Sequence, residues 1–360
     1  MISTTTNKTT TTPLSLSTTL STTARLTRQN RGSVHATRGI RILSPCHVMS
    51  KALEDFLRSQ LSTSVLRPLG AAGGGCISDG RSYLTDSGQV FVKHNTKREA
   101  EVMFKGEAAS LEAILKTDTL RVPKPVKVAE YPGGGWVLVT EHLNIGSLRS
   151  QQAALGRQLA RLHLHNISSL EKSNRIGVGE EEVGECVDQF GFICDTCCGL
   201  LPMPNEWRKD WVEFYCQMRL GKQLELVQQN YGDREAAELW TRLQRCIPRL
   251  FRGITVQPSL LHGDLWSGNA GQVEQTPVAY DPASFYGHHE FDLAITTMFG
   301  GFSPEFYSSY HDLIPRADGF SDRSQLYLLF HYLNHWNHFG SGYRSQSIAI
   351  MKKLVQHDTL

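Results

Sequence analysis

Short apolar runs separated by polar and glycine-rich turns mark residues 82–140 of the chain. Residues 82–85 and 90–93 are short runs rich in apolar, aromatic and β-branched residues on either side of an Asp-Ser-Gly turn, which predicts a β-hairpin. Between residues 97 and 116 the apolar positions recur every three to four residues instead, which predicts an amphipathic helix. Two further strands are predicted at 126–128 and 136–140, on either side of a glycine-rich turn. This order of strands around one helix predicts a small β-rich unit.

From residue 147 onward the pattern becomes largely helical. The first helix of this part is expected to end near His165. Further helices are predicted at 207–229, 235–246, 325–338 and 348–355, and a short strand at 278–280. We therefore expect an α+β fold of two lobes, with a small β-rich lobe at 50–143 and a larger helical lobe at 144–360.

Composition narrows the class of protein. The chain is 40% hydrophobic and 20% charged, as in an ordinary globular protein. The formal net charge is only +2, so bulk electrostatics give no case for nucleic acid. No run of about 18 apolar residues occurs, so no membrane-spanning helix is expected.

The first 49 residues differ from the rest. No acidic residue precedes Glu54, whereas threonine, serine and several arginines are abundant. This composition is typical of an organelle transit peptide, and the excess of hydroxyl residues favours a plastid over the alternative of a mitochondrion. A disordered tail without a targeting role is the other interpretation. We expect residues 1–49 to be a disordered transit peptide.

The run His-Gly-Asp-Leu-Trp-Ser-Gly-Asn at 262–269 carries the most informative chemistry. Phosphoryl transfer needs a carboxylate to take the proton of the attacking hydroxyl, oxygen ligands for Mg²⁺ and a cation on the phosphates. Asp264, followed five residues later by Asn269, has the spacing of a kinase catalytic loop. Asp281 ends a short predicted strand, where a second metal ligand belongs. The alternative is a polar turn without chemistry.

Lys93 ends the second strand of the hairpin and supplies the candidate cation. On the following predicted helix, Glu107 lies in the apolar stripe formed by Met103, Leu111 and Ile114. A carboxylate that faces a core is costly unless it is paired. We therefore expect an ion pair between Glu107 and Lys93 that holds the lysine on the nucleotide phosphates.

Two backbone segments are candidates for the rest of the nucleotide. A glycine cluster lies between a possible strand at 65–69 and the strand at 82–85, and its N–H groups are expected to approach the phosphates. The glycines expected to make this contact are Gly73, Gly74 and Gly75. Glu141, His142 and Leu143 follow a strand at the lobe boundary, where their backbone would meet the adenine edge.

Several motifs together carry a resemblance to a known family. They lie at 104–107, 132–135, 190–192, 197–199, 262–269, 280–287, 298–301 and 334–340. On these motifs the sequence resembles the fructosamine-3-kinase (ketosamine kinase) family, within the aminoglycoside-phosphotransferase-like branch of the protein-kinase fold. The resemblance extends from Lys51 to the C-terminus and is closest to the plant chloroplastic type.

The resemblance implies a substrate as well as a fold. Its members use ATP and Mg²⁺ to phosphorylate the sugar 3-hydroxyl of ketoamines on glycated proteins or small amines, which leads to deglycation. Plant members favour ribulosamine and erythrulosamine over fructosamine. By the resemblance, Asp264 is the base, Lys93 and Glu107 form the ion pair, and Asn269 and Asp281 bind the metal. The segment at 141–143 becomes the nucleotide hinge.

Four further expectations concern single side chains. Trp266 is expected to stack on the sugar or its amine substituent, with a core role as the alternative, and His335 is a second pocket candidate. Asp292 is expected to brace the catalytic loop. Cys76, at the end of the glycine cluster, is predicted to join two protomers in a redox-sensitive homodimer.

Other functions remain open at this point. A kinase of the same fold that acts on choline, homoserine or an aminoglycoside would need the same Asp264 and Asp281. A catalytically dead scaffold is a second alternative, although the joint presence of the five candidate residues disfavours it. A protein kinase is disfavoured because Asp-Pro-Ala stands at 281–283 in place of Asp-Phe-Gly.

Overall fold

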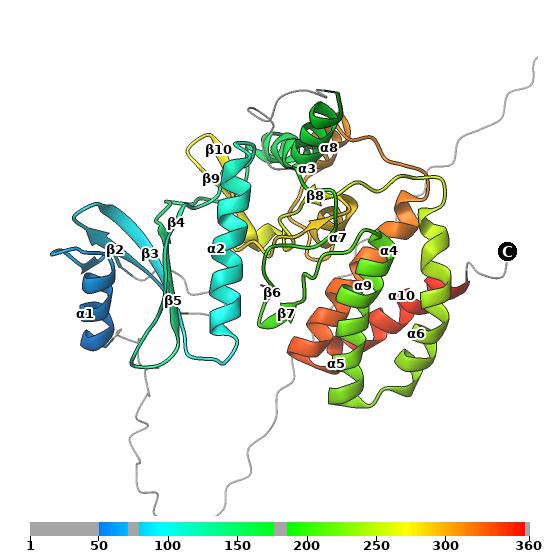
Figure 1. Cartoon of the computed structure of the whole chain (residues 1–360), viewed down its shortest axis with the longest axis horizontal. Helices are drawn as coiled ribbons and strands as arrows, with labels where there is room; N and C mark the ends of the chain where they lie inside the picture. Colours follow the sequence, from blue (N-terminus) through cyan, green and yellow to red (C-terminus); the bar gives the residue numbers. More distant parts are fainter. Residues whose placement is uncertain (1–49, 71–78, 176–185, 357–360) are drawn as a thin grey trace, which may run out of the picture. The chain divides into compact units, whose positions relative to one another are not determined.

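The structure is a computed structural model that describes residues 50–70, 79–175 and 186–356. Met49–Leu360 forms one compact unit, and everything described below lies within it. The unit begins with a β-sheet and continues with a mainly helical part (Figure 1), which confirms the predicted α+β class. The lobe boundary expected near residue 143 stays a prediction.

The sheet has five strands in the order β1-β2-β3-β5-β4, and every neighbouring pair is antiparallel. The predicted hairpin corresponds to β2 and β3, and the strands predicted on either side of the glycine-rich turn correspond to β4 and β5. The strands are β1 (Arg67–Pro68), β2 (Asp79–Thr85), β3 (Gly88–Asn95), β4 (Pro125–Glu130) and β5 (Trp136–Glu141).

Helices α1 (Lys51–Gln60) and α2 (Ala100–Lys116) lie on opposite faces of this sheet (Figure 1). Successive strand residues point to opposite faces, so neighbours belong to different cores. Val139 is buried in the cluster under α1, whereas Leu138 packs with Phe104 of α2. Lys93 of β3 pairs with Leu138 of β5, so it belongs to the face that turns toward α2.

The C-terminal part consists of helices and three short strand pairs. The helices are α3 (Gln152–Arg175), α4 (Trp211–Phe214), a π-helical segment at Tyr215–Gly221, α5 (Lys222–Tyr231), α6 (Arg234–Cys246), α7 (Glu290–Thr296), α8 (Pro304–His311), α9 (Phe320–Phe339) and α10 (Arg344–Gln356). The strand pairs are β6 (Thr196–Cys198) with β7 (Leu201–Met203), β8 (Ser259–Leu260) with β11 (Tyr286–Gly287), and β9 (Ala270–Val273) with β10 (Thr276–Ala279).

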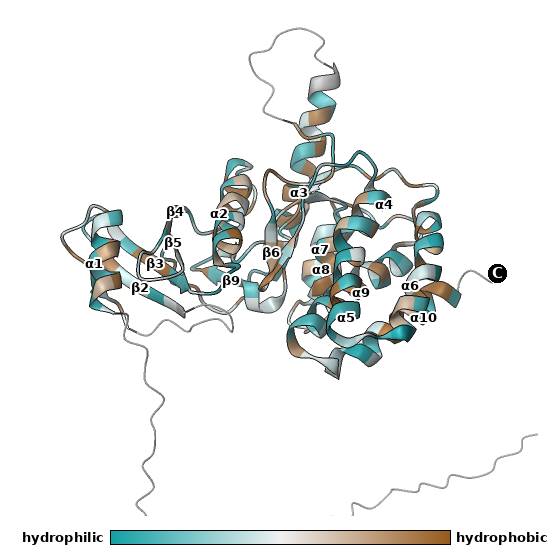
Figure 2. Ribbon diagram, turned by 60° about the horizontal axis from the view of Figure 1, so that its bottom comes forward, coloured by the Kyte–Doolittle hydropathy of each residue, from teal (hydrophilic) through white to brown (hydrophobic). Residues whose placement is uncertain are grey.

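One large core joins these helices, and their ribbons carry both hydrophobic and hydrophilic residues (Figure 2). Within this core, Arg323 of α9 makes a two-bond ion pair with Glu290 of α7, at 2.7 and 2.8 Å. Both side chains are almost fully buried. Because a guanidinium and a carboxylate match in shape, the pair fixes α7 against α9.

Two predicted helix boundaries are wrong. Helix α3 continues to Arg175 rather than ending near His165, because the polar residues after His165 include neither glycine nor proline. The helix predicted from residue 207 begins instead at Trp211. Its N-cap is Asp210, whose side chain accepts the backbone N–H of Glu213 at 2.7 Å.

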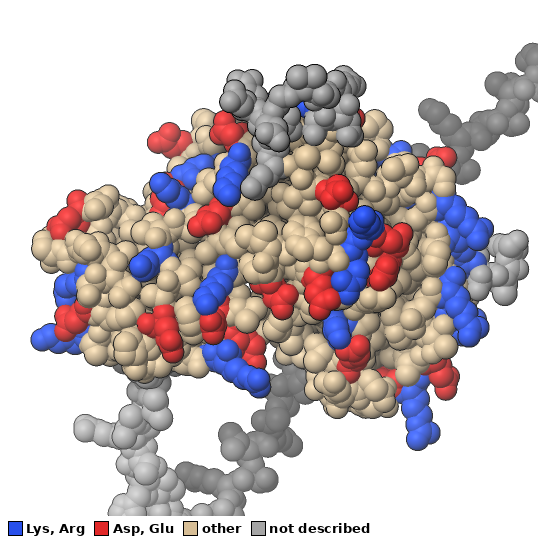
Figure 3. Space-filling model, in the orientation of Figure 1, with Lys and Arg blue, Asp and Glu red and all other residues tan. Residues whose placement is uncertain are grey.

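None of the helices in the described part of the chain is long and apolar enough to cross a membrane. On the face drawn in Figure 3, basic and acidic side chains are interspersed over most of the surface. Basic side chains gather along the right-hand edge of that view (Figure 3).

Candidate active site

The loop after β8 brings two of the predicted residues together. The side-chain nitrogen of Asn269 donates to the backbone oxygen of Asp264 at 2.8 Å and to its Oδ2 at 3.2 Å. A short 3₁₀ turn at Ser267–Asn269 provides the bend that makes these bonds possible. The five-residue spacing read from the sequence thus corresponds to a direct contact between the two side chains.

Asp292 braces this loop through hydrogen bonds, as expected. Its carboxylate accepts the backbone N–H groups of His262 at 2.7 Å and Gly263 at 2.8 Å. His163 donates its Nε2–H to the same carboxylate at 3.1 Å and accepts from the Tyr310 hydroxyl at 2.8 Å. Burial alone would raise the pKa of Asp292, but these hydrogen bonds hold it below the usual value.

Gly263 is the position where the loop requires glycine. Its φ angle is +86°, and a Cβ placed there would lie 2.0 Å from the backbone oxygen of Ala283. The close approach is stabilised by the backbone N–H of Ala283, which donates to His262 at 2.8 Å. Only glycine allows the catalytic loop and the segment after β10 to lie this close together.

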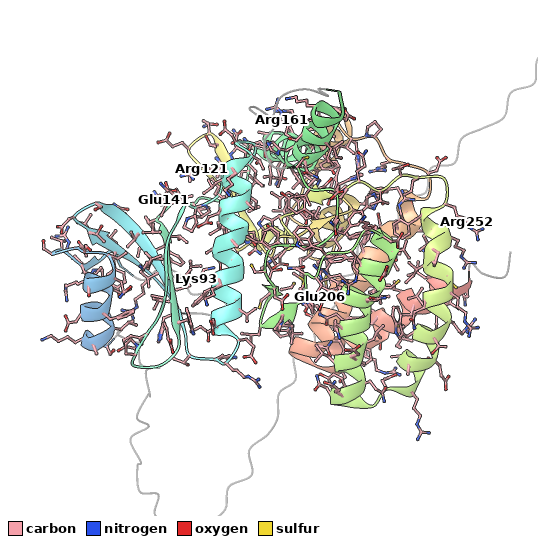
Figure 4. The ribbon with its side chains drawn as sticks, in the orientation of Figure 1. Lys93, Arg121, Glu141, Arg161, Glu206 and Arg252 are labelled. Carbon is pink, nitrogen blue, oxygen red and sulfur yellow. The ribbon has the colours of Figure 1, made fainter. Side chains whose placement is uncertain are left out.

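Lys93 lies on the α2-facing side of β3 (Figure 4) and contacts two carboxylates. Its Nζ is 2.6 Å from Oε1 of Glu107 and 2.7 Å from Oδ1 of Asp281. Burial would lower the pKa of Lys93, but the two carboxylates outweigh it and raise the pKa, so the ammonium stays charged. The expected pair with Glu107 is present, and the bond to Asp281 connects the sheet to the catalytic loop region.

Asp281 follows β10 in a left-handed conformation, with a φ angle of +57°. This conformation is uncommon for a residue other than glycine and is concentrated at functional sites. Its side chain is 46% exposed, so the carboxylate has room for a ligand besides Lys93. The sequence placed Asp281 near the catalytic loop but gave no sign of this backbone conformation.

The carboxyl of Asp264 has a pKa close to neutral pH. Burial and the negative charge of Asp281 raise its pKa to about 7, against the lowering effect of the hydrogen bond from Asn269. A base is most effective when its pKa is close to the working pH. The thiol of Cys198 also bonds to this carboxyl and accepts from the side chain of Asn334 at 3.2 Å. These two contacts were missed, because nothing in the sequence relates Cys198 to the loop.

The predicted hinge lies at the end of β5. Glu141 turns its side chain toward Arg121 at 2.5 Å (Figure 4), and its N–H donates to Lys124 at 2.8 Å. The N–H of His142 donates to the backbone of β3. The N–H of Leu143 donates to none of the residues that the structure describes.

One pocket of about 1210 Å³ contains these groups. The predicted residues that line it are Lys93, Glu107, Glu141, His142, Leu143, Asp264, Trp266, Asn269, Asp281 and His335. The structure therefore brings together the candidates for base, metal, nucleotide and acceptor. Gly73, Gly74, Gly75 and Cys76 lie outside the described residues, so the glycine loop and the Cys76 dimer stay predictions.

The sequence profile of the fructosamine kinase family matches residues 49–357. A mouse ketosamine-3-kinase is 55% identical over 307 residues, which cover 84% of this chain and 99% of that protein. A chloroplastic protein-ribulosamine 3-kinase of rice is 41% identical over 309 residues, 84% of each chain. Since identity to the mouse protein is higher, the comparison does not favour the plant type that the motifs suggested.

Solved structures share the fold. A putative fructosamine-3-kinase from Haemophilus somnus superposes with a TM-score of 0.68 at 23% identity, covering 84% of this chain and 96% of that one. An aminoglycoside phosphotransferase superposes with a TM-score of 0.56 at 13% identity, covering 85% and 99%. These likenesses confirm the predicted kinase-like fold.

Proposed function

This chain belongs to the fructosamine kinase family and is a phosphotransferase, and we propose that it transfers the γ-phosphoryl group of ATP to the sugar 3-hydroxyl of ketoamines. The names of its mouse and rice relatives support ketosamine and ribulosamine as the substrate class. The observation that carries the proposal is one pocket lined both by the Asp264 carboxyl, whose pKa burial raises to about 7, and by Lys93, which is paired with Glu107 and Asp281.

Each group in the pocket has a step to perform. Asp264 accepts the proton of the sugar hydroxyl. The hydroxyl oxygen forms a bond to the γ-phosphorus of ATP, and the bond between that phosphorus and the bridging oxygen of ADP breaks. Asn269 keeps the Asp264 carboxylate oriented through its amide nitrogen. Lys93, held by Glu107, places its positive charge on the phosphates once they displace Asp281 from its Nζ.

Asn269 and Asp281 fit a divalent ion. Both offer oxygen ligands, the kind that Mg²⁺ prefers. The amide nitrogen of Asn269 is occupied by Asp264, which leaves its oxygen available, and the Asp281 side chain is 46% exposed. Magnesium held there would neutralise negative charge on the phosphates.

The two parts of the chain divide this work. We assign the nucleotide to residues 50–143, with the N–H of Leu143 as the hinge donor and the glycine segment at 73–75 over the phosphates. Residues 144–360 carry the base and the acceptor site, where Trp266 and His335 line the pocket.

Transfer to the 3-hydroxyl would also explain deglycation. A phosphate at C3 is a far better leaving group than hydroxide. Enolisation of the C2 ketone toward C1 places that phosphate where it can be expelled, and hydrolysis then frees the amine. The product of this enzyme is thus expected to release the original protein amine.

The test is ATP consumption with ribulosyl-lysine, fructosyl-lysine, choline and an aminoglycoside as acceptors. Turnover of the two ketoamines, lost in Asp264→Asn, is the expected result. Turnover of choline or the aminoglycoside alone would replace the ketoamine assignment by another small alcohol. No turnover on any acceptor, with ATP still bound, would support a scaffold.

We also propose that residues 1–49 direct the protein to an organelle, with a plastid first and a mitochondrion as alternative. The family profile begins at residue 49, so residues 1–48 precede the part of the chain that matches the family. A fluorescent protein fused behind residues 1–49 should enter plastids of a plant cell. A diffuse cytosolic signal would refute the proposal.

A further inference from the structure

His335 and His338, near the end of α9, differ in the hydrogen bonding of their Nε2 atoms. The Nδ1 atoms of His335 and His338 lie 2.8 Å from the backbone oxygens four residues earlier. A carbonyl oxygen only accepts, so each ring carries its proton on Nδ1 and keeps a lone pair on Nε2. Nε2 of His338 accepts the N–H of Leu200 at 2.9 Å. Nε2 of His335 receives no hydrogen bond from any residue in the described ranges.

His335 belongs to a continuous row of rings beside the base. Ring centroids are 5.5 Å apart between Trp266 and Phe299, 5.2 Å between Phe299 and His335, and 5.4 Å between His335 and Phe339. Tyr343 lies 5.1 Å from His335. All five rings line the pocket, and we call them the aromatic wall.

The wall begins at the catalytic loop and ends at the surface. Trp266 is two residues from Asp264, and the backbone N–H of Trp266 donates to the backbone oxygen of Asp264 at 3.1 Å. Phe299 is 45% exposed and Phe339 is 60% exposed. Large apolar side chains exposed together beside a functional pocket are typical of a binding surface.

The wall also carries no charge. Among the described residues that line the pocket, those with charged side chains are Lys93, Glu107, Glu141, Asp264 and Asp281. All five are already assigned to the nucleotide, the metal, the hinge or the base. Burial lowers the pKa of His335, so its ring is neutral at pH 7 and does not repel a cation.

We propose that the aromatic wall, with Nε2 of His335 as hydrogen-bond acceptor, binds the protonated secondary amine of the ketoamine. The inference rests on the proposed function. The amine is attached to C1, two carbons from the C3 hydroxyl that Asp264 must reach, and the wall begins beside Asp264. Ring faces attract an ammonium ion, and a ring lone pair accepts its N–H. The enzyme would then recognise its sugar substrates by this ammonium group. A ketoamine formed on a protein lysine and one formed on a simple alkylamine would both be substrates.

The experiment compares two acceptors that share the sugar. One is a ribulose carrying an alkylamine at C1, and the other carries an alkyl ether of the same length. Wild-type enzyme should favour the amine by about 3- to 30-fold in kcat/KM, with the difference mainly in KM. Phe339→Leu and Phe299→Leu should each reduce this preference. His335→Phe keeps a ring and removes the acceptor, so it should reduce the preference as well.

Controls separate this inference from a general loss of function. Phe339→Tyr keeps an aromatic face and should keep the preference. Trp207→Leu changes a ring that is 37% exposed and does not line the pocket, and it should have no effect on the preference. Equal wild-type turnover of amine and ether, or equal losses on both acceptors in the Leu variants, would overturn the inference. Failure of the wild type on both acceptors would instead overturn the proposed function.

Discussion

Replacing Asp264 by asparagine should stabilise the protein while it removes catalysis. In the folded state the pKa of this carboxyl is about 7, against an ordinary value of 3.8. The folded chain therefore binds the proton more tightly than the unfolded chain. Stability falls as the pH rises from about 4 to about 7, because the unfolded chain releases the proton first and the folded chain must later hold a buried charge.

The difference of about three pH units corresponds to at most about 4 kcal/mol, at roughly 1.36 kcal/mol per unit. Asparagine lacks the charge but also offers one oxygen fewer to the two donors, Asn269 and Cys198. A net gain of about 1–3 kcal/mol at pH 8 is therefore expected, which is roughly 2–5 °C in Tm for a chain of this size. At pH 5 the gain should be smaller, since wild-type Asp264 is then protonated when folded.

The measurement is thermal unfolding by circular dichroism at pH 5 and pH 8, without nucleotide and with a chelator present. Asp55→Asn is the matched control, because that side chain is 58% exposed and should shift Tm little. The kcat of Asp264→Asn should fall by about 10²-fold or more. If the variant melts below wild type at pH 8, or gains equally at both pH values, Asp264 does not carry a raised pKa.

Three more predictions follow from single contacts. Asp281→Ala should weaken magnesium-dependent ATP binding by about tenfold or more in calorimetry, and unchanged affinity would make Asp281 structural. Arg323→Met leaves the Glu290 carboxylate buried without its partner, which should cost about 3–5 kcal/mol in urea unfolding. An unchanged urea midpoint would show that the pair contributes nothing. Gly263→Ala forces a Cβ onto a backbone oxygen at 2.0 Å, so both Tm and kcat should fall. Wild-type activity in that variant would contradict the proposed fit.

The part of the site that sequence predicts well depends on short-range patterns. Alternation along the hairpin places Lys93 on one face of the sheet, and helical periodicity places Glu107 in the stripe that meets it. Both rules involve only a few consecutive residues, so the pair could be expected. The contact between Asp264 and Asn269 is equally local, because one short turn separates them.

Contacts between distant segments could not be read in the same way. The bond from Lys93 to Asp281 joins residues 188 positions apart. Cys198 reaches Asp264 through a strand pair, β6 and β7, whose three-residue strands are too short to show a period. Nε2 of His335 keeps a free lone pair because the N–H of Leu200 donates to His338 instead. Tertiary packing decides which of the two histidines receives this bond.

Energetically unfavourable features are concentrated in the candidate active site, in the loop at 262–269 and in the segment after β10. Gly263 is crowded, Asp281 has a left-handed backbone, and Asp264 carries a carboxyl that resists ionisation. Such features persist only where the surroundings hold the chain in place. Here the surroundings are the fully paired carboxylate of Asp292 and the ion pair that fixes α7. The rigid helices thus keep Asp264, the proposed base, in surroundings that hold its pKa near 7. A mobile loop could turn this carboxyl toward water, and its pKa would then return toward the ordinary value.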